Sequence, residues 1–177
     1  YQWNEQGLDK SSLVYGGEIV NSFITPSDLR FFQGSLKNFQ RQISRATRFN
    51  GTWRHIDIPR LEIASEAEDI NISANGFVDG LQDKTPAWKL NLNQLVLSEA
   101  IIDFLHKNIE SIPEELTRIG SLTLSGQFSG EHNGAMTAQG TIATGIGDAD
   151  IYLHKSGNNQ FEGKITTEQF NLNQLTG

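Results

Sequence analysis

Apolar and polar residues alternate with a period of two through the last third of the chain, residues 119–177. Leu122, Leu124 and Phe128, for example, share one parity, while polar residues occupy the positions between them. This period is typical of strands with one buried and one solvated face. Glycine-containing segments at 130–134, 144–147 and 156–159 separate the runs and suit short hairpin turns. We therefore predict four antiparallel strands, at residues 122–128, 136–142, 149–153 and 161–165.

The same period, less regular, runs through residues 12–97. We predict a hairpin of residues 12–15 and 18–24 around Gly16 and Gly17, and a strand or strand pair over 39–53 that breaks near Gly51. Apolar positions shift phase by one residue at Pro59, which predicts a β-bulge on an edge strand. A second shift falls between Leu92 and Leu95.

One segment has helical periodicity. Residues 98–108 place Ile101, Ile102, Phe104 and Leu105 on one stripe behind Ser98 at the capping position. Shorter helical turns are predicted at 26–32, with Thr25 as the cap, and after Pro113.

Together these elements predict a mainly β protein: an elongated, curved antiparallel sheet of roughly ten strands, with one short helix and small helical turns. Residues 1–177 form one β-rich segment without a long linker, for which sub-units 1–97 and 98–177 are an alternative division. The hexapeptide at 90–95 recurs almost unchanged at 170–175 and suggests a partial internal repeat. A single methionine, Met136, and a start in mid-pattern indicate a piece excised from a longer protein.

Composition limits the classes of function. Hydrophobic residues make up only 37% of the chain, which predicts a thin, one-sided core. The net charge of −7 argues against nucleic acid as a partner. The chain contains no cysteine, so disulfides and thiol chemistry are excluded.

No pattern nominates catalytic chemistry. The four histidines have no ligand spacing, and Asp148 and Asp150 lack the remaining features of a calcium loop. Phosphate-loop and serine-nucleophile motifs are also missing. We expect neither an enzyme nor a bound metal or cofactor.

Charge is unevenly distributed. Residues 30–60 carry seven bases and one acid, whereas residues 61–83 carry six acids and no base. Neighbouring strands could pair these charges across the solvent face. Alternatively, Arg41, Arg45 and Arg48 could contact an anionic group.

The apolar strand faces also allow two interpretations, a closed sandwich core or an open groove. Gly126, Gly140 and Gly163 fall on the apolar parity and would leave that face poorly filled. An acyl chain in such a groove would gain about 0.8 kcal/mol per buried methylene. The predicted groove lining is Leu122, Leu124, Phe128, Met136, Ile142, Ile151, Leu153, Phe161 and Ile165.

Several segments resemble TamB-type proteins of the AsmA-like group of bacterial envelope proteins. Residues 24–32 are similar to a Ser-Pro-containing turn of that family, and residues 74–81 and the strand-helix step at 95–105 are similar to later parts. The strongest similarity lies at 124–130, 140–144 and 163–172. The motifs are loose glycine and apolar patterns, and their order resembles that in large proteins of Bacteroides-like bacteria.

The resemblance implies a periplasmic segment of a protein anchored in the inner membrane of a Gram-negative bacterium. It implies a half-open β-taco with an apolar interior and a role in outer-membrane biogenesis, either in phospholipid transfer between the two membranes or in assembly of outer-membrane proteins. Phospholipid or acyl chains and an outer-membrane β-barrel of the TamA or BamA kind are the implied partners. A strand-edge scaffold for barrel or secreted proteins is the alternative function.

Overall fold

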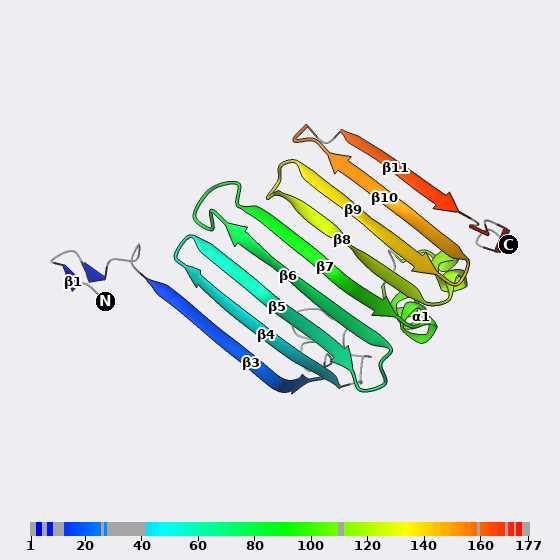
Figure 1. Cartoon of the computed structure of the whole chain (residues 1–177), viewed down its shortest axis with the longest axis horizontal. Coiled ribbons are helices and arrows are strands. Elements are labelled where there is room, and N and C mark those ends of the chain that lie inside the picture. The colour runs from blue at the N-terminus through cyan, green and yellow to red at the C-terminus, as the bar shows by residue number, and fades with distance from the viewer. Residues whose placement is uncertain are drawn as a thin grey trace.

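The computed structural model describes residues 3–4, 7–8, 13–25, 27, 42–109, 112–158, 160–168, 170–171 and 173–174. Nine strands form one antiparallel sheet in which every strand pairs with its neighbours in sequence. Figure 1 shows this meander as a single curled layer. The strands are β3 (Val14–Ile24), β4 (Ile43–Thr52), β5 (His55–Ser65), β6 (Ile70–Asp79), β7 (Ala87–Leu97), β8 (Leu122–Glu131), β9 (Met136–Thr144), β10 (Gly147–Lys155) and β11 (Phe161–Glu168).

Four smaller elements lie outside this sheet. Strands β1 (Trp3–Asn4) and β2 (Gly7–Leu8) form a separate two-stranded sheet near the N-terminus. Helix α1 (Glu99–Asn108) and the 3-10 helix η4 (Glu114–Ile119) lie between β7 and β8. β7 and β8 nevertheless pair directly, so the sheet continues across the connection.

The prediction of a mainly β, open and curved antiparallel sheet is confirmed. The four strands predicted in the last third are β8 to β11, and the predicted helix is α1. Ser98 occupies the capping position of α1, but its side chain makes no capping hydrogen bond. Most of the predicted helical turn at 26–32 lies outside the described residues.

Two predictions for the first half were wrong. Gly16 and Gly17 lie inside β3, where they pair with Asn50 and Phe49, and do not form a hairpin turn. A Cβ on Gly17 would lie 2.7 Å from the Phe49 ring, so the glycine makes room for an aromatic side chain on the next strand. Gly51 also continues a strand, β4, because the chain turns after Thr52.

The bulge predicted at Pro59 is present, but β5 is an interior strand and not an edge. Register shifts fall at this point in both ladders, between Arg48 and Asn50 on one side and between Ile58 and Leu61 on the other. A bulge leaves a residue unpaired, which explains how proline fits here without an amide hydrogen. The second predicted shift, between Leu92 and Leu95, also appears in the β7–β8 ladder.

The core is small, and its two clusters lie under the two helices. Only eight apolar side chains are buried among the described residues. Ile101 of α1 packs with Ile70 of β6, and Ile102 packs with Ile119 of η4 and Ile146 of the β9–β10 turn. The helices therefore cover one end of one sheet face.

Glycines on neighbouring strands permit close backbone contact. Gly126 pairs with Gly140 across the β8–β9 ladder. A Cβ on Gly126 would lie 2.3 Å from the Gln139 carbonyl oxygen, and one on Gly140 would lie 2.3 Å from that of Ser125. No other residue fits these positions without moving the backbone, which is typical of glycines at bends in curved sheets.

Candidate functional site

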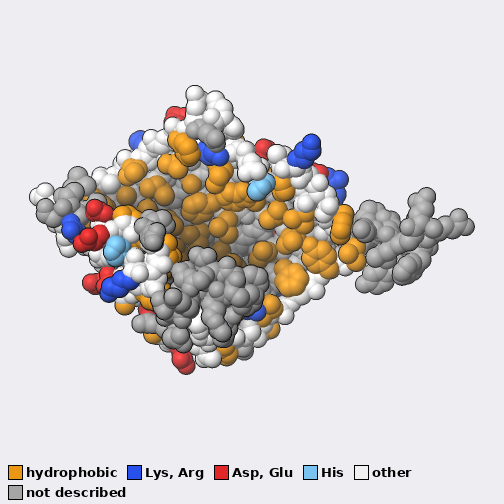
Figure 2. Space-filling view, turned by 180° about the vertical axis from the view of Figure 1, so that it is seen from behind, with side chains coloured by type: hydrophobic (Ala, Val, Ile, Leu, Met, Phe, Trp, Pro, Cys, Tyr) orange, Lys and Arg blue, Asp and Glu red, His pale blue; other side chains and the backbone are white. Residues whose placement is uncertain are grey.

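Strand register collects the apolar residues on one face of the sheet, which we call the trough face. One row across the strands contains Ile63, Ile72, Leu95, Leu124 and Ile142. Because side chains alternate between faces along a strand, rows two residues away lie on the same side. Figure 2 shows hydrophobic side chains gathered over a hollowed face.

All nine residues predicted to line a groove lie on the trough face. The β8–β9 ladder aligns Leu124 with Ile142 and Phe128 with Ala138, and the next two ladders continue these rows to β11. The nine residues are Leu122, Leu124, Phe128, Met136, Ile142, Ile151, Leu153, Phe161 and Ile165. Their shared face follows from the register, while their part in binding stays a prediction.

The trough face is exposed on parts of β10 and β11. Leu153 retains 47% of its surface, Phe161 68% and Ile165 70%. In the part of the chain that the structure describes, cover comes from α1, η4 and Phe170 and reaches only one end of the strands. A large apolar surface on a single sheet layer is more than an ordinary core requires, and such surfaces mark sites of interaction.

The trough face is hollowed where η4 meets the last four strands. A groove of about 450 Å³ opens there between η4 and β8 to β11. This volume lies within the range of about 300–1,000 Å³ typical of ligand pockets. The groove is lined by Leu116, Ile119, Leu122, Ile142, Thr144, Ala149, Ile151, Ile165, Thr167 and Phe170.

A second hollow of about 270 Å³ lies on the same face over β5 to β7. Gly76 lines it together with Ile58 and Leu90, its pairing partners on the neighbouring strands. Trp88 and Leu61 also contribute to its walls. The apolar surface therefore extends beyond the predicted residues of the last third into the first half of the sheet.

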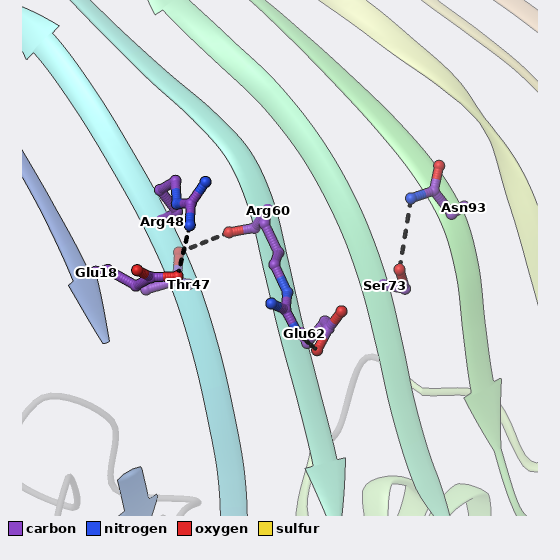
Figure 3. Close-up of polar contacts among 7 residues, drawn as sticks. All are labelled: Glu18, Thr47, Arg48, Arg60, Glu62, Ser73 and Asn93. Atoms are coloured by element: carbon purple, nitrogen blue, oxygen red, sulfur yellow. Dashed lines mark hydrogen bonds and ion pairs between the residues drawn. The ribbon is translucent and has the colours of Figure 1, made fainter. Parts of the chain in front are cut away.

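Ion pairs occupy the opposite, polar face. Arg48 pairs with Glu18 at 3.0 Å and Arg60 with Glu62 at 2.7 Å, as Figure 3 shows. The hydrogen bond from Arg60 lowers the pKa of the Glu62 carboxyl. Near one turn, Arg54 pairs with Asp83 at 2.7 Å.

The three arginines predicted to contact an anion have different surroundings. Arg45 lies on the trough face, opposite Ile63, and donates a hydrogen bond to Ser22 Oγ at 3.1 Å. Arg48 points to the polar face and is paired with Glu18. Arg41 lies outside the described residues. The structure therefore leaves Arg45 as the arginine placed beside the trough.

The other side chains considered as metal ligands do not form a site in the described part of the chain. Among the described residues, no three side chains of the metal-binding types come together. Asp150 accepts a hydrogen bond from Thr141 at 2.8 Å, across the polar face of β9 and β10. None of the described helices has the length and hydrophobicity to cross a membrane.

Several contributors to the trough are not among the nine predicted residues, and two of them show why. Phe170 belongs to the repeated hexapeptide, yet it packs near Ile102 and Ile146, whereas the first copy lies within β7. Trp88 also lies on the trough face, but the phase shifts in β5 and β7 hide this from the alternation in the sequence. Following the register through each bulge would have found it.

These features define a class of structure: an open antiparallel meander, curled around one apolar face and covered at one end by short helices. Comparison of the chain with protein-family models, with curated proteins and with solved structures finds no match to any of them.

Proposed function

We propose that the trough binds the acyl chains of a lipid and that the chain is not an enzyme. The observation that carries this proposal is the apolar face, which is continuous across the strands and exposed on parts of β10 and β11. Each buried methylene would contribute about 0.8 kcal/mol, so a short stretch of acyl chain supplies useful affinity. The groove beside η4 provides a partly enclosed starting point.

The dimensions of the trough fit one section of a longer lipid-transfer route and not a closed ligand pocket. Nine strands spaced about 4.8 Å apart span roughly 38 Å across the sheet. In this proposal, lipid acyl chains lie in the trough while polar groups face solvent. Arg45 is positioned to contact an anionic head group at the margin.

The resemblance to TamB-type proteins supports a specific setting for this activity. We propose a periplasmic segment of an inner-membrane-anchored protein that passes phospholipid between the inner and outer membranes. The open, curled sheet with an apolar concave face is the architecture that this role requires. The resemblance rests on the glycine and apolar segments described above.

Native mass spectrometry with lipid identification tests the proposal. Ile142 and Thr141 are adjacent on β9 and point to opposite faces, so Ile142→Lys and Thr141→Lys form a matched pair. We expect phospholipid on the unmodified chain and on Thr141→Lys, and loss of lipid from Ile142→Lys. No lipid uptake by the unmodified chain, or equal uptake by both variants, would contradict the proposal.

A second pair keeps the test independent of folding defects. Leu153 is 47% exposed on the trough face, and the neighbouring Tyr152 is 42% exposed on the polar face. Because neither position is part of the core, both Lys variants should fold. Only Leu153→Lys should reduce lipid binding.

The alternative is a scaffold that binds strands of outer-membrane β-barrel or secreted proteins at a sheet edge. The observation in its favour is that β3 and β11 each lack a partner on one side among the described residues. Binding of a barrel-derived peptide by the lipid-free chain, without any lipid uptake, would favour this function over the first.

A further inference from the structure

Strand β11 has an open edge of regular geometry. All eight of its side chains are exposed, and no described residue pairs with its outer side. In an antiparallel ladder, every second residue of an edge strand directs its N–H and C=O groups outward. β11 therefore offers unpaired backbone groups to a further strand.

The opposite edge is less suited to pairing. The β3–β4 ladder shifts register between Ile19 and Ser22, and a bulge twists an edge away from an incoming strand. The β10–β11 ladder pairs eight consecutive residues without a shift, from Phe161 to Glu168. A partner strand would find a straight ladder only at β11.

The described residues after β11 leave this edge accessible. The backbone N–H of Asn171 donates to the Ile146 carbonyl at 2.8 Å, and Phe170 packs against the cluster of Ile102, Ile119 and Ile146. These contacts hold residues 170 and 171 against the β9–β10 turn, on the side of β11 that faces β10.

The sequence of β11 is complementary to itself in one antiparallel register. With Gly163 opposite Gly163 of a second copy, Phe161 faces Ile165 of that copy on the trough side. On the polar side, Glu162 faces Lys164, and the two-fold symmetry repeats both pairs. Aromatic–β-branched and opposite-charge pairs are both stabilising across strands. We propose that two copies of this chain associate through β11 in this register.

Neighbouring registers are less favourable. Moving the centre by one residue places Glu162 opposite Glu162, or Lys164 opposite Lys164, and like charges directly opposite each other destabilise a sheet. Pairing Lys164 with Glu168 removes that repulsion, but it sets Phe161 and Glu162 against residues beyond the end of β11. Only the register centred on Gly163 pairs Glu162 with Lys164 and also pairs Phe161 with Ile165.

The association would join two trough faces. Edge-to-edge antiparallel pairing keeps the same faces on the same side, so the apolar rows continue from one copy into the next. Phe161 and Ile165, which are 68% and 70% exposed, would each gain an apolar neighbour. This dimer requires no lipid and is a property separate from the proposed lipid binding.

Sedimentation velocity of the full 177-residue chain and its charge variants tests the dimer. Glu162→Lys and Lys164→Glu should each raise the dissociation constant by about tenfold, because each replaces two attractive pairs by two repulsive ones. An equimolar mixture of the two variants restores opposite charges at every pair. The mixture should therefore form a heterodimer as stable as the unmodified homodimer, which a variant with a folding defect would not do.

Glu168→Lys is the matched control. It makes the same change of charge on the same strand and face, but Glu168 lies outside the proposed pairing. It should leave the dissociation constant unchanged. Circular dichroism of each variant confirms the fold.

Three outcomes would overturn the proposal. The unmodified chain could remain monomeric at about 100 µM, which would leave no association of useful strength. The dimer could be insensitive to both variants of residues 162 and 164, which would place it at another surface. Glu168→Lys could weaken the dimer while Glu162→Lys does not, which would establish the other register.

Discussion

Ser65 organises the turn between β5 and β6 through a single hydroxyl. Its Oγ accepts hydrogen bonds from the backbone N–H of Asp69 at 3.1 Å and of Ile70 at 3.0 Å. The side chains of Ser65 and Asp69 also hydrogen-bond, and both residues are buried. The turn leads into Ile70, which belongs to the cluster under α1. A polar side chain thus positions part of the small core.

Substitution Ser65→Ala should reduce the free energy of unfolding by about 1–3 kcal/mol, because two buried backbone N–H groups lose their acceptor. Urea denaturation measures this change. Ser121 is exposed, so Ser121→Ala should stay within about 0.5 kcal/mol of the unmodified chain. Equal effects of the two substitutions would show that the hydroxyl of Ser65 has no special role.

Arg60 and Glu62 give a pH-dependent contribution on the polar face. The Arg60 hydrogen bond lowers the pKa of Glu62 in the folded chain. The stabilisation is therefore present above the unfolded pKa of Glu62 and is lost as pH falls through the lower, folded value. In an NMR titration, Arg60→Ala should raise the pKa of Glu62. Arg48→Ala, which removes the partner of Glu18, should leave it unchanged.

At the scale of elements, the regular strands could be predicted and the irregular ones only in part. β8 to β11 alternate without a register shift, so apolar positions identify both the strands and their shared face. In β5 and β7, bulges change the parity in mid-strand, so the face is known only after the register is known. Gly16 and Gly17 look like a turn in the sequence because their packing partner, Phe49, lies on another strand.

The close backbone contact between β8 and β9 depends on paired glycines, and this can be tested. A Cβ at position 140 would lie 2.3 Å from the Ser125 carbonyl oxygen and 3.1 Å from Gly126 Cα. Gly140→Ala should therefore cost about 1–3 kcal/mol in a denaturation experiment. A Cβ at Gly157 would meet nothing within 4 Å, so Gly157→Ala is the control and should cost less than about 0.5 kcal/mol. A neutral Gly140→Ala would contradict the close contact.

At the scale of the whole molecule, apolar surface exceeds what the core uses. The buried clusters involve α1, η4 and one end of the sheet, whereas Leu153, Phe161 and Ile165 of the trough face stay exposed. Sequence alternation predicted that face but could not distinguish a groove from a closed sandwich, because both have the same pattern. The difference lies in whether a second sheet layer covers the nine strands, and the described residues form only one further sheet, the two-stranded β1–β2.

The central claim is that lipid occupies the trough face and not the polar face. Ile151 and Tyr152 are adjacent on β10 and point to opposite faces, so a photo-crosslinking amino acid at each position compares the two faces at nearly the same place. With labelled phospholipid, we expect crosslinks from position 151 and only background from position 152. Equal labelling at both positions, or none from position 151 in a folded protein, would contradict the account.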